Sequence, residues 1–158
     1  MRWKRFDEQG YPEQMQTMNL CILAAILAIV VNIPFRARTV TSLVLDGKHT
    51  DVSLPEGREC IEFHVTPERM KVPKIFDATL EDTKHSRPRL IIDWFIAGPR
   101  IELLRNPRLL RTNIRNENLL FCGINRARYN RVLTTWSEEV GLRMTTHMFR
   151  HALASILI

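Results

Sequence analysis

The feature that most constrains the fold is an apolar run near the start of the chain, LCILAAILAIVV, which spans residues 20–31. Twelve residues fall short of the roughly 20 that an α-helix needs to cross a bilayer. Pro12 suits the first turn of a helix, and Asn32 and Pro34 suit its end. The pattern therefore predicts a helix from Pro12 to Val31 that is buried on nearly all sides, with a membrane segment as the weaker alternative.

The remaining pattern predicts a mainly α chain with a small antiparallel β-sheet, an α+β fold. The segment ECIEFHV alternates in the strand period, with Ile61, Phe63 and Val65 on one face. After a turn at TPER, the segment KVPKIFDATL returns as a second strand, and a short strand near Val52 completes the sheet. Residues 100–118 have no clear pattern. Further helices are expected at 36–45, 89–97, 126–140 and from His147 onward.

The charge balance favours a partner that carries phosphate. The 158 residues hold 23 Lys and Arg against 17 Asp and Glu, a net charge of +6. Between Arg100 and Arg150 there are ten arginines, no lysine and four acidic residues. Because a guanidinium presents a planar fork of donors that fits phosphate oxygens, this bias favours nucleic acid over a merely solvated basic face.

The cysteines indicate the compartment. Cys21, Cys60 and Cys122 are far apart and form no C-x-x-C pair. Such spacing gives neither a disulfide framework nor a zinc knuckle, and it favours a reducing cytoplasm. We therefore expect a cytoplasmic, DNA-associated protein that is not bound to a membrane.

A polar cluster opens the last predicted helix, in the stretch TTHMFRHALASILI. His147, Arg150 and His151 are spaced i, i+3 and i+4, so they share one face of its first turn. Free N–H groups and the helix dipole favour an anion there, which predicts a phosphate clamp. Zinc is the weaker alternative, because Met148 stands where H-E-x-x-H has glutamate and Arg150 would oppose a cation. A polar helix end without function is the other alternative.

The stretch THMFRHALAS resembles the second conserved box, H-x-x-R-H, of the tyrosine recombinases, the phage integrase family. The first box of that family is an arginine that opens a helix, often written P-x-R-x-x-N-L-x-x-L. The segment PFRARTVTSL places Arg36 in that register, with Thr39 where asparagine is frequent. The resemblance covers residues 18–158 of a single partial catalytic domain, 1–158, with residues 1–17 as a lead-in.

Family members carry a catalytic lysine on a β-hairpin between the two boxes. The segment ECIEFHVTPERMKVPKIFDATL looks like that hairpin. Lys71 matches the lysine, and Lys74 is the alternative if the turn is shifted by three residues.

The resemblance implies site-specific DNA recombination or integration, in which a tyrosine attacks a phosphodiester of duplex DNA without a metal or other cofactor. Arg36 and Arg150 would hold the charge that develops on the phosphate oxygens. His147 would donate a hydrogen bond or assist proton transfer, and Lys71 would act as general acid toward the leaving 5′-oxygen. His151 is a possible assistant. The arginines expected to contact DNA are Arg38, Arg126, Arg128 and Arg131.

The resemblance also places the tyrosine nucleophile beyond the second box, after Ile158. The two tyrosines of the chain, Tyr11 and Tyr129, precede that box. We therefore expect this chain to lack strand cleavage on its own unless another subunit supplies a tyrosine, and we expect a homo-oligomer on DNA for a full-length form. A small basic DNA-binding or regulatory module without catalysis is the alternative function, and a structural or interaction protein is a third.

Overall fold

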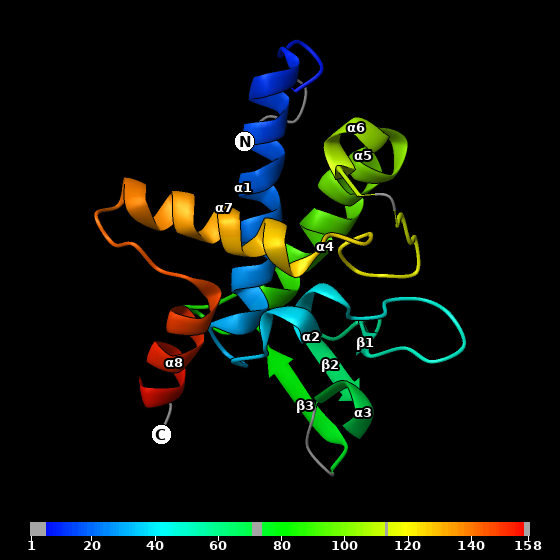
Figure 1. The fold of residues 1–158 in the computed structure, drawn as a ribbon. Coiled ribbons are helices and arrows are strands. Elements are labelled where there is room, and N and C mark those ends of the chain that lie inside the picture. Colours follow the sequence, from blue (N-terminus) through cyan, green and yellow to red (C-terminus); the bar gives the residue numbers. More distant parts are fainter. Residues whose placement is uncertain (1–5, 71–73, 113, 157–158) are drawn as a thin grey trace.

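The computed structural model describes residues 6–70, 74–112 and 114–156. These residues form a mainly helical chain with one three-stranded antiparallel sheet, so the predicted α+β class is confirmed (Figure 1). The core is built around α1, Tyr11–Val30, which is contacted by helices on more than one side.

The apolar run forms the C-terminal half of α1. Pro12 lies in its first turn, and the Glu13 carboxylate accepts a hydrogen bond from the Gly10 N–H at 2.7 Å. By length and composition α1 could cross a bilayer, but 56% of its most apolar window is buried inside the protein. Burial of that kind is consistent with the core helix of a soluble protein. It is less complete than the predicted burial on nearly all sides, because Leu20 is 42% exposed.

The sheet has the order β1 (Val52–Ser53), β2 (Cys60–Val65) and β3 (Phe76–Glu81). The inward face of β2 is the predicted one, because Ile61, Phe63 and Val65 are all buried. Phe35 packs edge-on against Phe63, with ring centroids 5.6 Å apart. This contact joins the sheet to the segment that leads into α2, Ala37–Thr41.

Helix α2 is shorter than the predicted helix 36–45. The Ser42 hydroxyl donates to the Arg38 carbonyl at 2.7 Å, and Thr41 donates to Ala37 at 2.8 Å, which closes the last turn. Beyond it the chain is extended, and the Leu45 N–H donates to the Asn118 carbonyl at 2.8 Å. Pairing with this distant segment, which local periodicity does not reveal, ends the helix early.

Three short helices begin at prolines, at which the missing N–H costs nothing. They are α4 (Pro88–Ala97), α5 (Pro99–Arg105) and α6 (Pro107–Leu110), and the last two occupy much of the region that the sequence left unassigned. A fourth, α3 (Pro67–Met70), stands where a turn was predicted.

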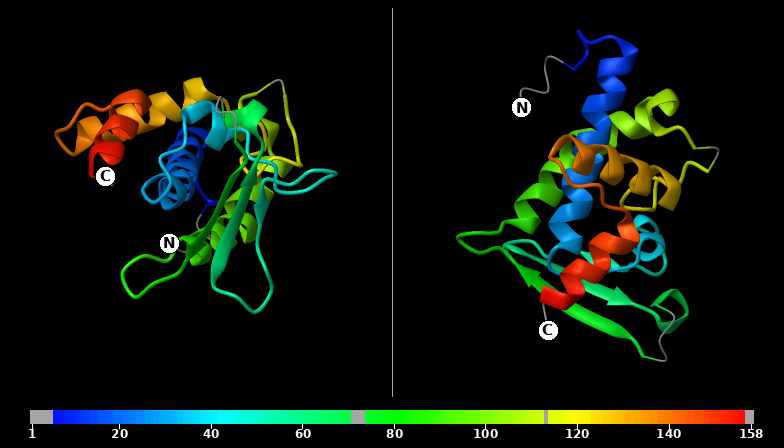
Figure 2. Two further views of the ribbon diagram at one scale, coloured as in Figure 1. Left: turned by 90° about the horizontal axis from the view of Figure 1, so that it is seen from below. Right: turned by 60° about the vertical axis from the view of Figure 1, so that its left-hand side comes forward.

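The last two helices are α7 (Arg126–Glu139) and α8 (Thr146–Ile156). Asn125 caps α7 by accepting from the Arg128 N–H at 2.9 Å. In Figure 1 and in the right-hand view of Figure 2, α7 crosses α1, and α8 lies beside the C-terminal end of α1. Helix α7 ends one residue before the predicted helix 126–140 does: Val140 follows its last residue and is 57% exposed.

Replacing Gly123 by alanine is expected to destabilise the fold strongly. Gly123 has φ +98°, and a Cβ there would collide with the Ile114 carbonyl oxygen. Collision and backbone strain together predict a loss of about 2–4 kcal/mol in the free energy of unfolding, measured by urea denaturation. Gly57→Ala is the control, because Gly57 has φ +70° but open space around it. Equal losses for the two variants would contradict the predicted collision.

Candidate anion-binding site

An open cavity of about 780 Å³ lies where α2, α3, α7 and α8 meet. Its described lining residues include no carboxylate. Their polar side chains are dominated by cations and imidazoles, which attract an anion. The charged and imidazole side chains are those of Arg36, Arg38, Arg69, Arg126, His147, Arg150 and His151.

The first two turns of α8 supply the histidines and one arginine. Thr145 caps this helix, since its hydroxyl accepts from the Met148 N–H at 3.3 Å. The Asn130 carboxamide oxygen accepts from both the backbone N–H and the hydroxyl of Thr146, at 3.0 and 3.2 Å. These bonds tie the start of α8 to α7. The ring centroids of His147 and His151 lie 4.3 Å apart, and the two rings pack edge to face.

The segment leading into α2 meets α8 directly. The Nε of Arg150 donates to the Pro34 carbonyl at 3.0 Å, although the two residues are 116 positions apart. Arg36 occupies the residue before α2, and its side chain is exposed. Arg36 and Arg150 therefore line the same cavity from opposite ends of the chain.

Six of the nine predicted site residues line this cavity: Arg36, Arg38, Arg126, His147, Arg150 and His151. Lys71 lies outside the described residues. The alternative, Lys74, is exposed and does not line the cavity.

The predicted DNA contact of Arg128 is wrong, because the side chain is buried. It is 5% exposed, and its guanidinium donates to the Leu109 and Leu110 carbonyls at 2.7 and 2.6 Å and to the Asn19 side-chain oxygen at 2.9 Å. Burial, aided by the charge of Arg131, lowers its pKa to about 10, so it stays charged at neutral pH. Because its donors satisfy the carbonyls at the end of α6, this guanidinium is not available to a DNA phosphate.

Arg131 is also separate from the cavity. It is exposed and lines a second groove, of about 370 Å³, between α1 and α7, together with Leu20 and Trp136. Arg126 and Asn130 on the same helix face the cavity instead. The structure therefore divides the predicted DNA-contacting arginines among the cavity, the core and this second groove.

Neither tyrosine of the chain lines the cavity. Tyr129 is 3% exposed, and burial raises its pKa to about 12. The Tyr11 hydroxyl donates to the Arg108 carbonyl at 3.1 Å, and the Arg108 guanidinium lies 4.7 Å from the centre of its ring. Neither side chain is placed to attack a phosphate held between Arg36 and Arg150.

The described side chains do not form a group of ligands suited to a metal ion. Within residues 6–70, 74–112 and 114–156, no three His, Cys, Asp or Glu side chains group together in a way that could hold a metal ion. The chemistry of the cavity is electrostatic: it can hold and polarise an anion that carries several acceptor oxygens.

One charged lining residue, Arg69, was not predicted from the sequence. It belongs to the TPER segment, which reads only as a turn. No local pattern shows that its side chain reaches Asp51, 18 residues earlier.

Comparison of the chain with protein-family models, with curated proteins and with solved structures found no match.

Proposed function

We propose that the cavity binds a backbone phosphate of duplex DNA, and that the chain is a catalytic segment of the tyrosine-recombinase type, which acts in site-specific recombination or integration. One observation carries the proposal. Arg36, from the first recombinase-like box, lines the same cavity as His147 and Arg150 from the second, and Arg150 is hydrogen-bonded to the segment that precedes Arg36.

The chemistry follows from where the cations lie. Attack on a phosphodiester builds negative charge on its non-bridging oxygens, and preorganised guanidinium groups stabilise that charge. Arg36 and Arg150 take this role, and His147 donates a hydrogen bond to the same phosphate. Arg38 and Arg126 extend the positive field toward neighbouring phosphates. The assignment of Lys71 as general acid stays a prediction.

The proposed reaction also needs a nucleophile that this cavity does not contain. Because Tyr129 is buried and Tyr11 is bonded to Arg108, we expect the 158-residue chain to bind DNA without cleaving it. A tyrosine from another subunit, in a homo-oligomer on DNA, would restore cleavage. The proposed location is the cytoplasm, in association with DNA.

The proposal is tested by the salt dependence of DNA binding, followed by fluorescence anisotropy of a labelled duplex. Contacts with phosphates release counterions, so the logarithm of the binding constant should fall linearly with the logarithm of the salt concentration, by about 0.9 per phosphate contacted. We expect a slope steeper than about −2. Affinity that hardly changes with salt would contradict the proposal. A covalent protein–DNA adduct through Tyr11 or Tyr129 would contradict the expectation that this chain does not cleave DNA on its own.

A second candidate function is a DNA-binding or regulatory module without catalysis. The placement of both tyrosines outside the cavity favours it. An added small nucleophile separates the two, because a site built for phosphoryl transfer stabilises the charge that develops on the phosphate whatever the nucleophile is. Cleavage of the bound duplex by hydrogen peroxide that is lost in Arg36→Ala supports the recombinase-type site, and binding without such cleavage supports the non-catalytic module.

A further inference from the structure

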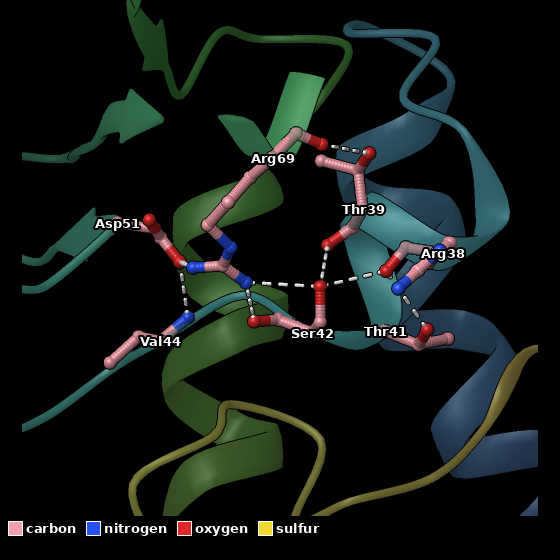
Figure 3. Close-up of polar contacts among 7 residues, drawn as sticks. All are labelled: Arg38, Thr39, Thr41, Ser42, Val44, Asp51 and Arg69. Carbon is pink, nitrogen blue, oxygen red and sulfur yellow. Dashed lines mark hydrogen bonds and ion pairs between the residues drawn. The ribbon is translucent and has the colours of Figure 1, made fainter. Parts of the chain in front are cut away.

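Arg69 lines the cavity, yet its guanidinium is held by Asp51 and Ser42 (Figure 3). Asp51 is 5% exposed and forms an ion pair with Arg69, while its carboxylate also accepts from the Val44 N–H at 2.7 Å. The other arm of Arg69 donates to the Ser42 carbonyl and, at 3.0 Å, to the Ser42 hydroxyl oxygen. These donors bind the protein itself, whereas the side chains of Arg36 and Arg38 are exposed.

Arg69 is tied to α2 at its backbone as well. The Thr39 hydroxyl donates to the Arg69 carbonyl at 3.3 Å. Both the backbone and the side chain of Arg69 therefore connect α3 to α2 and to Ser42, the residue that follows α2. Helix α2 has five residues, and so short a helix is not stable by itself. Its orientation therefore depends on tertiary contacts such as these, and Arg36 and Arg38 take their direction from it.

The ion pair also resolves an electrostatic conflict. Arg69 lies in a lining that already holds four other arginines, and like charges repel. Asp51 compensates the charge of Arg69 from the buried side. Without it, the charge of Arg69 would be unpaired among these arginines, and the side chain would lose the contact that holds it.

We propose that Arg69, held by Asp51, is a positioning residue that sets α2 and thereby aims Arg36 at the bound phosphate. This inference rests on the function proposed above. It assigns Arg69 no direct contact with DNA.

The test measures duplex DNA affinity for Arg36→Ala in the wild-type and in the Arg69→Gln background. If Arg69 acts through Arg36, Arg69→Gln alone should weaken binding roughly tenfold. Adding Arg36→Ala to the Arg69→Gln protein should then reduce DNA affinity much less than Arg36→Ala reduces it in the wild type. Losses that multiply in the double variant would mean that Arg69 contacts DNA independently, and they would overturn the inference.

A matched control separates positioning from simple loss of stability. Arg89, on α4, likewise has a guanidinium held by the protein and does not line the cavity. It donates hydrogen bonds to the Asp93 carboxylate at 2.9 Å and to the carbonyls of Pro55 and Cys60 at 3.0 and 2.8 Å. Arg89→Gln should lower the melting temperature but leave DNA affinity of the folded protein within about twofold. An equal loss of affinity in both variants would overturn the inference.

Asp51→Asn provides a second route if Arg69→Gln does not fold. Asparagine keeps the volume and the acceptor for the Val44 N–H but removes the charge that holds Arg69. It should reproduce the weakened binding and the smaller effect of Arg36→Ala, and unchanged affinity would overturn the inference. If Arg36→Ala has no effect even in the wild type, the proposed function itself fails.

Discussion

Replacing Arg36 or Arg150 by alanine is expected to weaken binding of duplex DNA by about tenfold or more. A hydrogen bond to a charged group contributes about 1.5–3 kcal/mol, and each guanidinium can make two such bonds to one phosphate. The slope of log affinity against log salt should also become shallower by about one for each arginine removed. Fluorescence anisotropy of a labelled duplex at several salt concentrations measures both quantities.

Arg105→Ala is the control for this experiment. Arg105 is exposed at the end of α5 and does not line the cavity, so its removal changes the net charge by the same amount. Its affinity should stay within about twofold of the wild type. If Arg105→Ala weakens binding as much as Arg36→Ala does, DNA binds a diffuse basic surface and the cavity has no special role.

Replacing Arg128 by alanine is expected to have the largest effect on stability among the arginines. The substitution leaves the buried carbonyls of Leu109 and Leu110 and the Asn19 side chain without their donor. Each unsatisfied buried acceptor costs about 1–3 kcal/mol, so we expect the free energy of unfolding to fall by about 2–4 kcal/mol. Urea denaturation followed by tryptophan fluorescence measures this loss.

The same variant separates a structural role from a DNA-binding one. At a temperature at which Arg128→Ala is still folded, its DNA affinity and salt slope should match those of the wild type. Arg128→Lys keeps the positive charge but loses the planar set of guanidinium donors. Its free energy of unfolding should therefore lie between those of Arg128→Ala and the wild type. A stable Arg128→Ala protein with weakened DNA binding would show that the side chain faces DNA instead of the core.

The main elements of the fold were predictable where the burial pattern is local. The apolar run that forms α1 and the alternation of Ile61, Phe63 and Val65 in β2 depend only on residues close in sequence. The early end of α2 was not predictable, because the Leu45 N–H bonds to Asn118. Helices α5 and α6 were missed for a related reason: they are short, and burial of their leucines depends on distant segments.

The candidate site, too, was predictable from spacing only where its residues are close in sequence. Spacing alone puts His147, Arg150 and His151 on one helical face, whereas no spacing rule connects Arg36 with them. Arg126 and Arg128 look alike in sequence, yet two residues along a helix turn a side chain to roughly the opposite side. One of them lines the cavity, and the other is buried beneath α6.

The central claim is that Arg36 and Arg150 act on one phosphate, and a double-mutant cycle tests it most directly. Duplex affinity is measured for the wild type, Arg36→Ala, Arg150→Ala and the double variant under one salt condition. Two arginines that grip the same phosphate should show a coupling energy of at least about 0.5 kcal/mol. Losses that add to within about 0.3 kcal/mol would contradict the claim, because they would mean that the two side chains bind DNA independently.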